Sequence, residues 1–314
     1  MILGGAGFVG SNIVQVFLNN GYQVTVIDGL LQKTGGSKTN LKHFLSQINF
    51  VHSKIEDFES LKECIEKHHV IIDCMAWTSH KEALEDPVYD LKLNLSSHLH
   101  LIKNILKNEN KNKKIVYLAS IGQFGNTNSL TIDEVTPMVP IDIQGVHKLA
   151  AESYYRIYSN LNGLNIISLR FPNCFGFNQP FTIEDIGLVG GFIRDLLQDK
   201  KVIIFGKQRK RSIVYASDIA EIVFRLINQS WVGFHPLNVA GSYLSIEKIV
   251  VNLIKIIKKG GYTFEPMPDN IKKIDMGSSP IREEQLKKLI SEVPKTNLES
   301  ALSVTVDYFK KVCI

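Results

Sequence analysis

The 314-residue sequence has no apolar run that approaches the ~18 residues a membrane helix needs, so we expect no transmembrane span. Its first residues show no basic stretch followed by an apolar one, and we expect no signal peptide. Cysteine is scarce: Cys64, Cys74, Cys174 and Cys313 form no C-x-x-C pair and have no zinc-finger spacing. This scarcity argues against a disulfide scaffold and a metal site, and it favours buried free thiols in a reducing cytoplasm.

An excess of one charge is also missing. Lys plus Arg number 36 and Asp plus Glu 31, which leaves a net charge of +5. So mild an excess argues against a nucleic-acid partner, but it suits anionic small molecules such as nucleotides. The chain is long enough for a large core, with two domains or one domain and an appended lobe.

Short apolar runs alternate with helical patterns up to about residue 180. Such alternation predicts parallel strands joined by right-handed crossovers, which is an α/β, doubly wound Rossmann sheet. The predicted strands cover residues 22–27, 70–74, 115–119 and 165–169. The predicted helices cover residues 10–20, 58–66, 89–106, 144–160 and 217–228.

After residue 180 the rhythm loosens, with a strand predicted at 202–205 and helices near 246–258 and 297–311. We expect residues 1–180 to form the sheet domain, with strands and helices from about 200–230 returning to it. Residues 181–314 should form mainly a smaller substrate-binding lobe. That lobe should cover the carboxyl edge of the sheet, where ligands of such sheets bind.

Gly4, Gly7 and Gly10 follow a short apolar run and open an apolar-periodic helix. Without Cβ atoms, the backbone N–H groups can approach a pyrophosphate, and the helix N-terminus adds partial positive charge. Asp28 stands at the end of the next strand, about 20 residues later. A carboxylate there accepts hydrogen bonds from ribose hydroxyls and repels a 2′-phosphate. The pattern therefore predicts NAD rather than NADP.

Five later segments extend this pattern. They are Asp86-Pro87 with Asn94, and residues 119–125 (ASIGQFG), 144–152 (QGVHKLAAE), 170–176 (RFPNCFG) and 211–218 (RSIVYASD). With the glycine loop, they resemble the extended short-chain dehydrogenase/reductase family of nucleotide-sugar epimerases, dehydratases and dehydrogenases. The resemblance implies an NAD-dependent enzyme whose second ligand is a nucleotide-diphosphate sugar.

The resemblance also implies which residues touch the two ligands. The residues expected to hold the cofactor are Gly4, Gly7, Phe8, Val9, Gly10, Asp28, Lys54, Ile55, Met75, Ala76, Lys148 and Phe171. The residues expected at the substrate are Trp77, His80, Ser120, Asn173, Arg211 and Arg282. Among these, Asn173 and Arg211 would contact the diphosphate, because a guanidinium fork matches phosphate oxygens.

In this family a Ser or Thr and a Tyr converge on one sugar hydroxyl, and a Lys one helical turn after the Tyr lowers its pKa. Ser120 and Lys148 match that pattern, but Gln144 stands where the Tyr would be. An amide is no general base in this pH range. Ser120, Gln144 and Lys148 are therefore the predicted catalytic residues, and the base is left open.

Several accounts of the proton remain. Lys148 itself, or a water held by Gln144 and Ser120, could take it; burial and a nearby nicotinamide charge would lower the pKa of Lys148. Another side chain could enter, with His80 the best candidate and His147 a weaker one. A small shift of register could bring in a different group. Finally, the protein could be catalytically inactive.

The residues after Ser120 narrow the reaction. Ile121 and Gly122 stand where 4,6-dehydratases of the family carry an Asp-Glu pair, which argues against dehydration. We expect NAD-dependent oxidation at C4 of a nucleotide-diphosphate sugar, by a 4-dehydrogenase that resembles the GDP-manno-heptose enzymes of capsule polysaccharide biosynthesis. A nucleotide-sugar 4-epimerase is the alternative, weakened because it must take and return a proton at every turnover. A non-catalytic NAD-binding sensor is a second alternative.

Relatives of this kind often pair two helices from each subunit into a four-helix bundle. The matching segments here are residues 89–106 and 144–160, and Leu95, Leu99 and Ile102 are the candidate exposed apolar residues, although core packing would suit them equally. We expect a cytoplasmic homodimer without nucleic-acid or membrane partners.

Overall fold

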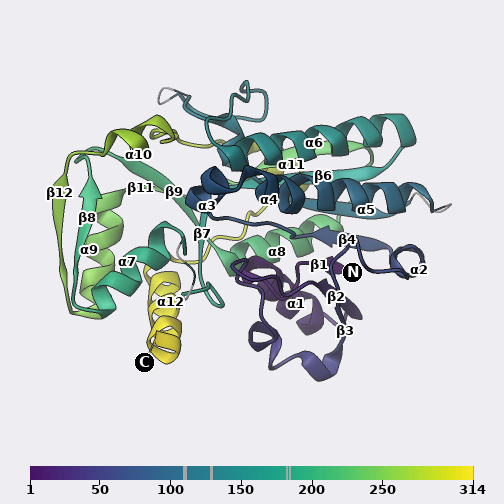
Figure 1. The fold of residues 1–314 in the computed structure, drawn as a ribbon, viewed down its shortest axis with the longest axis horizontal. Helices are drawn as coiled ribbons and strands as arrows, with labels where there is room; N and C mark the ends of the chain where they lie inside the picture. Colours follow the sequence, from purple (N-terminus) through teal and green to yellow (C-terminus); the bar gives the residue numbers. More distant parts are fainter. Residues whose placement is uncertain (109–111, 128–129, 182, 184, 314) are drawn as a thin grey trace.

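The computed structural model describes residues 1–108, 112–127, 130–181, 183 and 185–313. Its centre is a seven-stranded sheet, in which every pairing of neighbouring strands is parallel and the order is β10-β6-β5-β4-β1-β2-β3 (Figure 1). The strands are β1 (Ile2–Leu3), β2 (Val24–Asp28), β3 (Ile48–His52), β4 (Val70–Asp73), β5 (Lys114–Ser120), β6 (Asn165–Phe171) and β10 (Phe234–Asn238). The order reverses between β1 and β4, so the predicted doubly wound Rossmann sheet is confirmed.

Helices cover both faces of this sheet. In Figure 1, α5 (Ser97–Leu106) and α6 (Ile143–Asn162) lie above it, and α1 (Phe8–Asn19) and α8 (Ala216–Ile227) lie below. The short α2 (Leu61–Glu66) shares the core of α5 and α6. Strand side chains alternate between the two layers, as the pleat requires. In β5, for example, Val116 and Leu118 face α1 and α8, whereas Tyr117 faces the other layer.

The predicted helix over residues 89–106 is interrupted. The chain forms α3 (His80–Glu85), α4 (Pro87–Leu91), a π-helical turn (Lys92–Ser96) and then α5. The turn buries Asn94, whose side chain accepts from the Trp77 N–H (3.0 Å) and donates to the Trp77 carbonyl (2.8 Å) and to Asp90 (2.9 Å). Asn94 therefore anchors the loop that leaves β4 at the carboxyl edge of the sheet.

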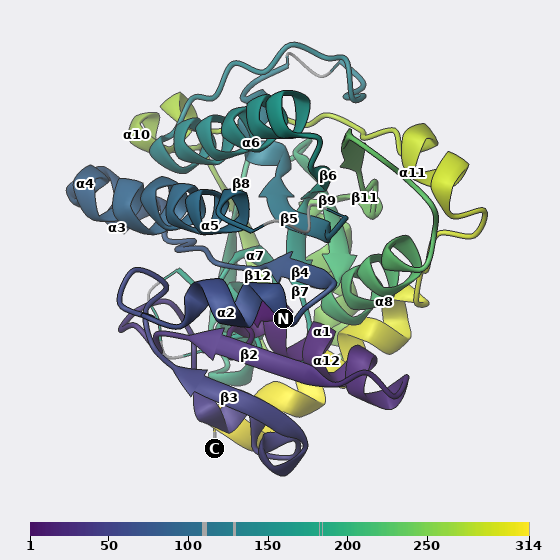
Figure 2. The ribbon, with the colours of Figure 1, turned by 90° about the vertical axis from the view of Figure 1, so that its right-hand side faces the viewer.

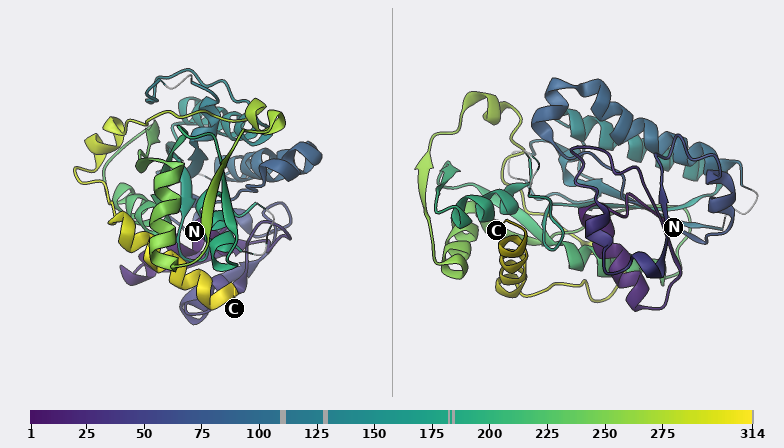
Figure 3. Two further views of the ribbon diagram at one scale, coloured as in Figure 1. Left: turned by 90° about the vertical axis from the view of Figure 1, so that its left-hand side faces the viewer. Right: turned by 60° about the horizontal axis from the view of Figure 1, so that its bottom comes forward.

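The lobe lies beyond that edge, on the left in Figure 1 and facing the viewer in the left panel of Figure 3. It holds a three-stranded sheet of β11 (Ser242–Ser245), β9 (Lys210–Tyr215) and β7 (Asn173–Phe175), and a parallel pair of β12 (Gly261–Glu265) and β8 (Lys201–Phe205). Its helices are α7 (Leu188–Leu197), α9 (Ile246–Ile257) and α12 (Leu298–Cys313), which share one apolar core. The short helices α10 (Asp269–Lys273) and α11 (Glu284–Leu289) and the 3₁₀ turns η1 (Lys38–Leu41), η2 (Leu45–Gln47) and η4 (Ile121–Phe124) complete the described elements.

The chain crosses between the two parts more than once. α8 and β10 return to the large sheet, and α8 packs beside α1 (Figure 2). The returning stretch is thus 216–238, later than the expected 200–230, and β8 and β9 belong to the lobe instead.

Two compositional expectations can be compared with the described residues. None of their helices is both long enough and apolar enough to cross a membrane. Cys64, Cys74 and Cys174 are free thiols, half-buried rather than fully buried, and burial raises their pKa values. The side chain of Cys313 lies outside the described residues.

Candidate active site

A cleft of about 770 Å³ lies between the carboxyl edge of the large sheet and the lobe. The ends of β1, β2, β4, β5 and β6, the first turns of α1 and α6, and helix α7 of the lobe all contribute to its lining. Every residue predicted at the cofactor lines this cleft, and so do all those predicted at the substrate except Arg211 and Arg282.

The glycine loop forms one end of the cleft. Gly4 has a φ of +68°, and a Cβ atom at Gly10 would lie 2.3 Å from the Gly4 carbonyl oxygen. The first turn of α1 is therefore packed directly on the loop backbone. The N–H groups of that turn have no intrahelical acceptor, and no side chain intrudes at Gly7 or Gly10. Such a cradle fits a pyrophosphate.

Asp28 closes the loop from the next strand. One carboxylate oxygen accepts from the Ala6 N–H (2.9 Å), and the other accepts from the Leu30 N–H (2.8 Å). Burial raises the pKa of Asp28, and these two backbone donors oppose that rise. A carboxylate offers about four lone-pair positions, so two remain for ribose hydroxyls. Lys54 and Ile55 line the same end of the cleft.

The end of the cleft that holds the predicted catalytic residues begins where β5 turns into η4 (Ile121–Phe124). Ser120 caps this turn: its Oγ accepts from the Gly122 N–H (3.0 Å). The first turn of α6 presses on the same turn, because a Cβ atom at Gly145 would lie 2.8 Å from the Gly122 carbonyl oxygen. The backbone of α6 therefore contacts the backbone of η4 directly, and this contact holds Ser120 close to the first turn of α6, which carries Gln144.

Lys148 is buried one helical turn after Gln144. Its Nζ donates to the carbonyls of Met75 (3.4 Å) and Leu118 (3.3 Å) and lies 5.0 Å from the centre of the Tyr117 ring. Burial lowers the pKa of Lys148 to about 8, although nearby carboxylates oppose the fall. Both carbonyls come from strand ends at the cleft, so the ammonium group is fixed beside Met75, which also lines it.

Gln144 carries an unpaired donor. Its Nε2 is buried and has no hydrogen-bond partner among the described residues. A buried N–H group without an acceptor is destabilising by about 1–3 kcal/mol. Because Gln144 lines the cleft, a ligand oxygen is the natural acceptor for this amide.

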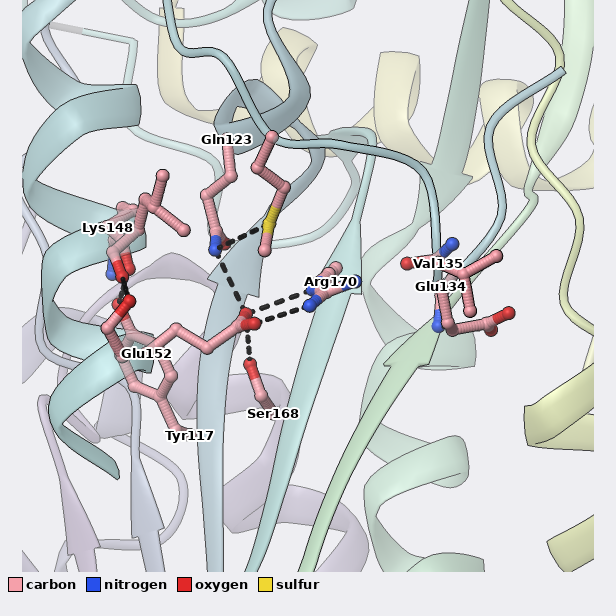
Figure 4. A network of polar contacts seen from close by, with 12 residues as sticks. Tyr117, Gln123, Glu134, Val135, Lys148, Glu152, Ser168 and Arg170 are labelled. Atoms are coloured by element: carbon pink, nitrogen blue, oxygen red, sulfur yellow. Dashed lines mark hydrogen bonds and ion pairs between the residues drawn. The ribbon is translucent and has the colours of Figure 1, made fainter. Parts of the chain in front are cut away.

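A buried ion pair fixes α6 behind the cleft (Figure 4). The Glu152 carboxylate accepts from Gln123 Nε2 (2.9 Å), Ser168 Oγ (2.7 Å) and Arg170 Nε (2.9 Å), and it also pairs with Arg170 Nη2. Burial alone would raise the pKa of Glu152, but Arg170 holds it below its usual value. The pair joins α6 to β6 and η4, and so sets the position of Lys148 one turn earlier.

A second buried network, not foreseen from the sequence, supports Met75. Asp73 accepts from the Met75 N–H (3.1 Å), and its other oxygen lies 2.6 Å from both Tyr155 Oη and His98 Nδ1. Burial opposes ionisation of Asp73, but the contact with His98 lowers its pKa below the usual value. The network holds the Met75 carbonyl that Lys148 contacts.

His80 contacts two carboxylates near the N-terminus of α6. Asp142 is the N-cap of α6 and accepts from the Gly145 N–H (2.6 Å), while its other oxygen lies 3.2 Å from His80 Nδ1. Asp185 accepts from the His80 backbone N–H (3.1 Å). All three residues line the cleft. Sequence patterns gave no sign of Asp142 or Asp185, because neither lies in a segment of the family pattern.

The lobe arginines differ from expectation. Arg211 pairs with Asp275 and donates to the Gly277 carbonyl, and Arg282 is an exposed residue, so the structure does not bring either to the cleft. The arginine that lines the cleft is Arg194 of α7. Its Nε lies 3.7 Å from Asp195, and about a third of its side chain is exposed.

His147, a weaker candidate base, is also placed away from the cleft. It is 8% exposed, its Nδ1 lies 2.6 Å from Asp90, and it does not line the cleft. Neighbouring residues of an α-helix point about 100° apart, which explains the difference from Lys148.

Comparison with known proteins decides the family. Residues 1–240 match the family model described as the NAD dependent epimerase/dehydratase family. The chain belongs to this family. It is an NAD-dependent enzyme of the nucleotide-sugar epimerase and dehydratase class, and NAD is its cofactor. The glycine cradle and the free lone pairs of Asp28 fit that cofactor.

Individual relatives agree with this assignment. The chain is 32% identical over 232 residues to a putative UDP-glucose 4-epimerase of Methanocaldococcus jannaschii, covering 73% of each protein. It is 26% identical to the crystal structure of a Thermotoga maritima UDP-glucose 4-epimerase with UDP-glucose, with a TM-score of 0.87 over 100% of this chain and 99% of that one. A Thermus thermophilus UDP-glucose 4-epimerase in complex with NAD is 25% identical, with a TM-score of 0.84 over 98% of both chains.

Proposed function

We propose that this enzyme is a 4-epimerase of a nucleotide-diphosphate sugar, with a UDP-hexose as the first substrate to test. The observation that carries the proposal is one continuous cleft, which joins the glycine cradle to the lobe and has Ser120, Gln144 and Lys148 between them. The names of the relatives at 32% and 26% identity, a putative and a solved UDP-glucose 4-epimerase, support the choice of reaction and nucleotide.

Each residue has a defined task in this proposal. Bound NAD supplies an acceptor, and later a donor, for the hydrogen at C4. Ser120 Oγ contacts the C4 hydroxyl and polarises it. The unpaired Gln144 amide donates to the oxygen that becomes a ketone, where a placed donor stabilises developing charge. Lys148, held by two carbonyls, keeps a positive charge at the nicotinamide end.

The substrate diphosphate requires cationic or amide donors from the lobe side. We assign this part to Arg194 of α7 and to Asn173 at the start of β7, both of which line the cleft. Asn173 Nδ2 already donates to the Ser212 carbonyl (3.3 Å), which fixes its direction. In this assignment Arg194 takes the place that the sequence pattern gave to Arg211 and Arg282.

A second candidate is the 4-dehydrogenase that the sequence suggested, of GDP-manno-heptose type and active in capsule polysaccharide biosynthesis. The observation in its favour is Gln144, because an enzyme that releases the 4-keto sugar does not need to return a proton. The two candidates differ in net oxidation: a dehydrogenase accumulates NADH, whereas an epimerase does not.

The test combines cofactor analysis with a substrate panel. Denaturing the purified protein and identifying the released dinucleotide by mass spectrometry should give NAD or NADH, and NADP would contradict the role of Asp28. Incubation with UDP-glucose, UDP-N-acetylglucosamine and GDP-manno-heptose should then give the 4-epimer of one UDP-sugar. The absorbance at ~340 nm should not increase, because no NADH accumulates. Stoichiometric NADH and a 4-keto product would select the dehydrogenase instead.

We also propose a homodimer built on α4 and α6. The expected interface residues need correction: Ile102 is 1% exposed and belongs to the core, and Leu95 and Leu99 are half-buried. The apolar residues that α4 and α6 do expose are Val88, Leu91, Val146, Tyr154, Ile157 and Leu161. Sedimentation at micromolar concentration should give a dimer mass, and a monomer there would contradict the proposal.

A further inference from the structure

The proton of the C4 hydroxyl needs an acceptor, and this inference therefore rests on the proposed function. Gln144 cannot accept it. His147 is paired with Asp90 and does not line the cleft. Lys148 directs its Nζ to two main-chain carbonyls, where the charged form makes the better donor. In the described part of the chain, the cleft lining includes one imidazole, that of His80.

His80 is held from two sides. Asp142 lies 3.2 Å from its Nδ1, and Asp185 accepts from its backbone N–H. A carboxylate at Nδ1 favours the tautomer that carries its proton on that nitrogen, which leaves the lone pair on Nε2. Nε2 has no hydrogen-bond partner within the described residues, and about half of the side chain is exposed. A free, oriented imidazole nitrogen is thus available beside the head of α6.

The position of Asp142 connects this imidazole to the catalytic end. Asp142 caps α6, Gln144 follows two residues later, and Gly145 meets the Ser120 turn through backbone contact. One helix end therefore carries both the carboxylate that contacts His80 and the amide whose buried Nε2 has no partner among the described residues. His80 approaches the same end from the N-terminus of α3, in the loop that Asn94 anchors.

We propose that His80 is the general base that replaces the missing tyrosine, with Asp142 as its positioning residue. In the oxidation half-reaction, Nε2 takes the proton of the C4 hydroxyl while the C4 hydrogen leaves as hydride to the cofactor, and the C–O bond becomes a ketone. In the return half-reaction, the ketone receives hydride on the other face and the imidazolium returns the same proton to oxygen. No additional oxidant or acid is consumed.

The electrostatic surroundings of His80 suit this task. Burial opposes the charged imidazolium, but Asp142 of α6, Asp185 before α7 and Asp90 of α4 outweigh it and raise the pKa of His80 above its usual value. A base with a pKa near the working pH is efficient. Since the neutral form is required, kcat/KM should fall as the pH drops through this raised value.

Two variants test the proposal with the full-length, NAD-loaded protein. His80→Gln should keep the melting temperature and the affinity for NAD and UDP-glucose, while kcat falls about 10²- to 10⁴-fold, as expected for loss of a general base. Asp142→Asn keeps the helix cap, since Asn caps as well as Asp, but it removes the charge. Its kcat should fall less, and the acid limb of its pH profile should move to lower pH.

The chain offers a matched control. His147 of α6 and Asp90 of α4 form a second His–Asp pair outside the cleft lining, so His147→Gln should leave the acid limb where it is in the wild type. If His80→Gln leaves kcat and the acid limb unchanged, or raises KM alone, the general-base proposal is overturned. A limb that stays near pH 8 in His80→Gln would assign the proton to Lys148.

A spectroscopic measurement tests the role of His80 separately from the proposed 4-epimerase activity. In protein labelled with ¹³C at the histidine rings, the signal lost in His80→Gln should titrate above pH 6.5. It should also shift when UDP-glucose is added to the NAD-loaded enzyme, but not when UDP alone is added. If wild type converts no nucleotide sugar, the 4-epimerase proposal fails, and an unshifted His80 signal would then overturn the His80 proposal independently.

Discussion

The two ends of the cleft are built in different ways. At the cofactor end, the contacts come from backbone: Gly4 and Gly10 touch through main-chain atoms, and Asp28 is fixed by two N–H groups. At the substrate end they come from side chains, namely His80, Asp142 and Arg194, on three elements far apart in sequence. A backbone site constrains residue types within a short stretch, whereas a side-chain site depends on how distant elements pack.

The largest expected effect lies where the two ends meet. Lys148→Met should lower kcat about 10²- to 10³-fold, because the positive charge that we assign to the nicotinamide end is lost. Methionine is flexible enough to fill the space, so NAD should still bind and the fold should persist. Steady-state kinetics with a calorimetric NAD titration measure both. An unchanged kcat would remove Lys148 from the catalytic residues.

The same variant should change the pH dependence of stability. Because the folded-state pKa of Lys148 is about 8 against a usual 10.5, wild type should gain stability as the pH rises from about 8 to 10.5, where only the unfolded state keeps the proton. The total is about 3 kcal/mol at 1.36 kcal/mol per unit. Urea unfolding should show Lys148→Met more stable than wild type at pH 7, with the advantage shrinking by pH 10. A constant difference would contradict the lowered pKa.

The next largest effect is expected at the glycine loop, where the cleft is lined by backbone. Gly10→Ala adds a Cβ atom 2.3 Å from the Gly4 oxygen and should weaken NAD binding roughly 10- to 100-fold, at the 1–3 kcal/mol of an overpacked site. Gly191→Ala in α7 is the matched control, since its Cβ atom meets nothing within 4 Å. Calorimetric titration of NAD compares them, and equal affinities would show that the cradle is not tightly packed.

The smallest effect tests the side-chain end. Arg194→Ala should raise KM for the nucleotide sugar about 10-fold with kcat unchanged, because a partly exposed charged hydrogen bond contributes near the low end of 1.5–3 kcal/mol. Arg282→Ala should change neither constant. Arg211→Ala should lower the melting temperature, because Asp275 then keeps only Arg209 of its two arginine partners, but it should leave KM alone. A rise in KM only in Arg211→Ala would restore the role first expected from the sequence.

This contrast explains what the sequence could predict. The parallel sheet with its strands β2, β4, β5 and β6, its main helices and the glycine cradle follow from local apolar periodicity and from glycine placement, and they were predicted. Strand β10, whose short run contains Pro236, was not predicted. Strand β3 was missed because, at the sheet edge, none of its side chains is fully buried and its apolar run is weak. The division of residues 87–106 into α4, a π-helical turn and α5 was not predicted. The turn buries Asn94 against the loop that holds Trp77, and this is a tertiary contact that helical periodicity does not show.

The residues on the substrate side of the cleft were harder to predict from the sequence. Arg211 carries a recognisable spacing, yet its guanidinium is held by Asp275, a residue 64 positions away. Asp142 looks like a simple helix cap, and only the packing of α3 against α6 brings His80 to it. Because such contacts depend on tertiary distance, no local pattern in one sequence contains them.

The contact between Gly145 and Gly122 has a consequence for how the site can change. Since main chain rests on main chain there, the width of the catalytic end is set by atomic radii and not by the side chain at position 144. Different side chains can therefore replace Gln144 without displacing the backbone of α6 or of the turn after Ser120. Variation in the reacting group, and with it the chemistry, is thereby separated from variation in the scaffold.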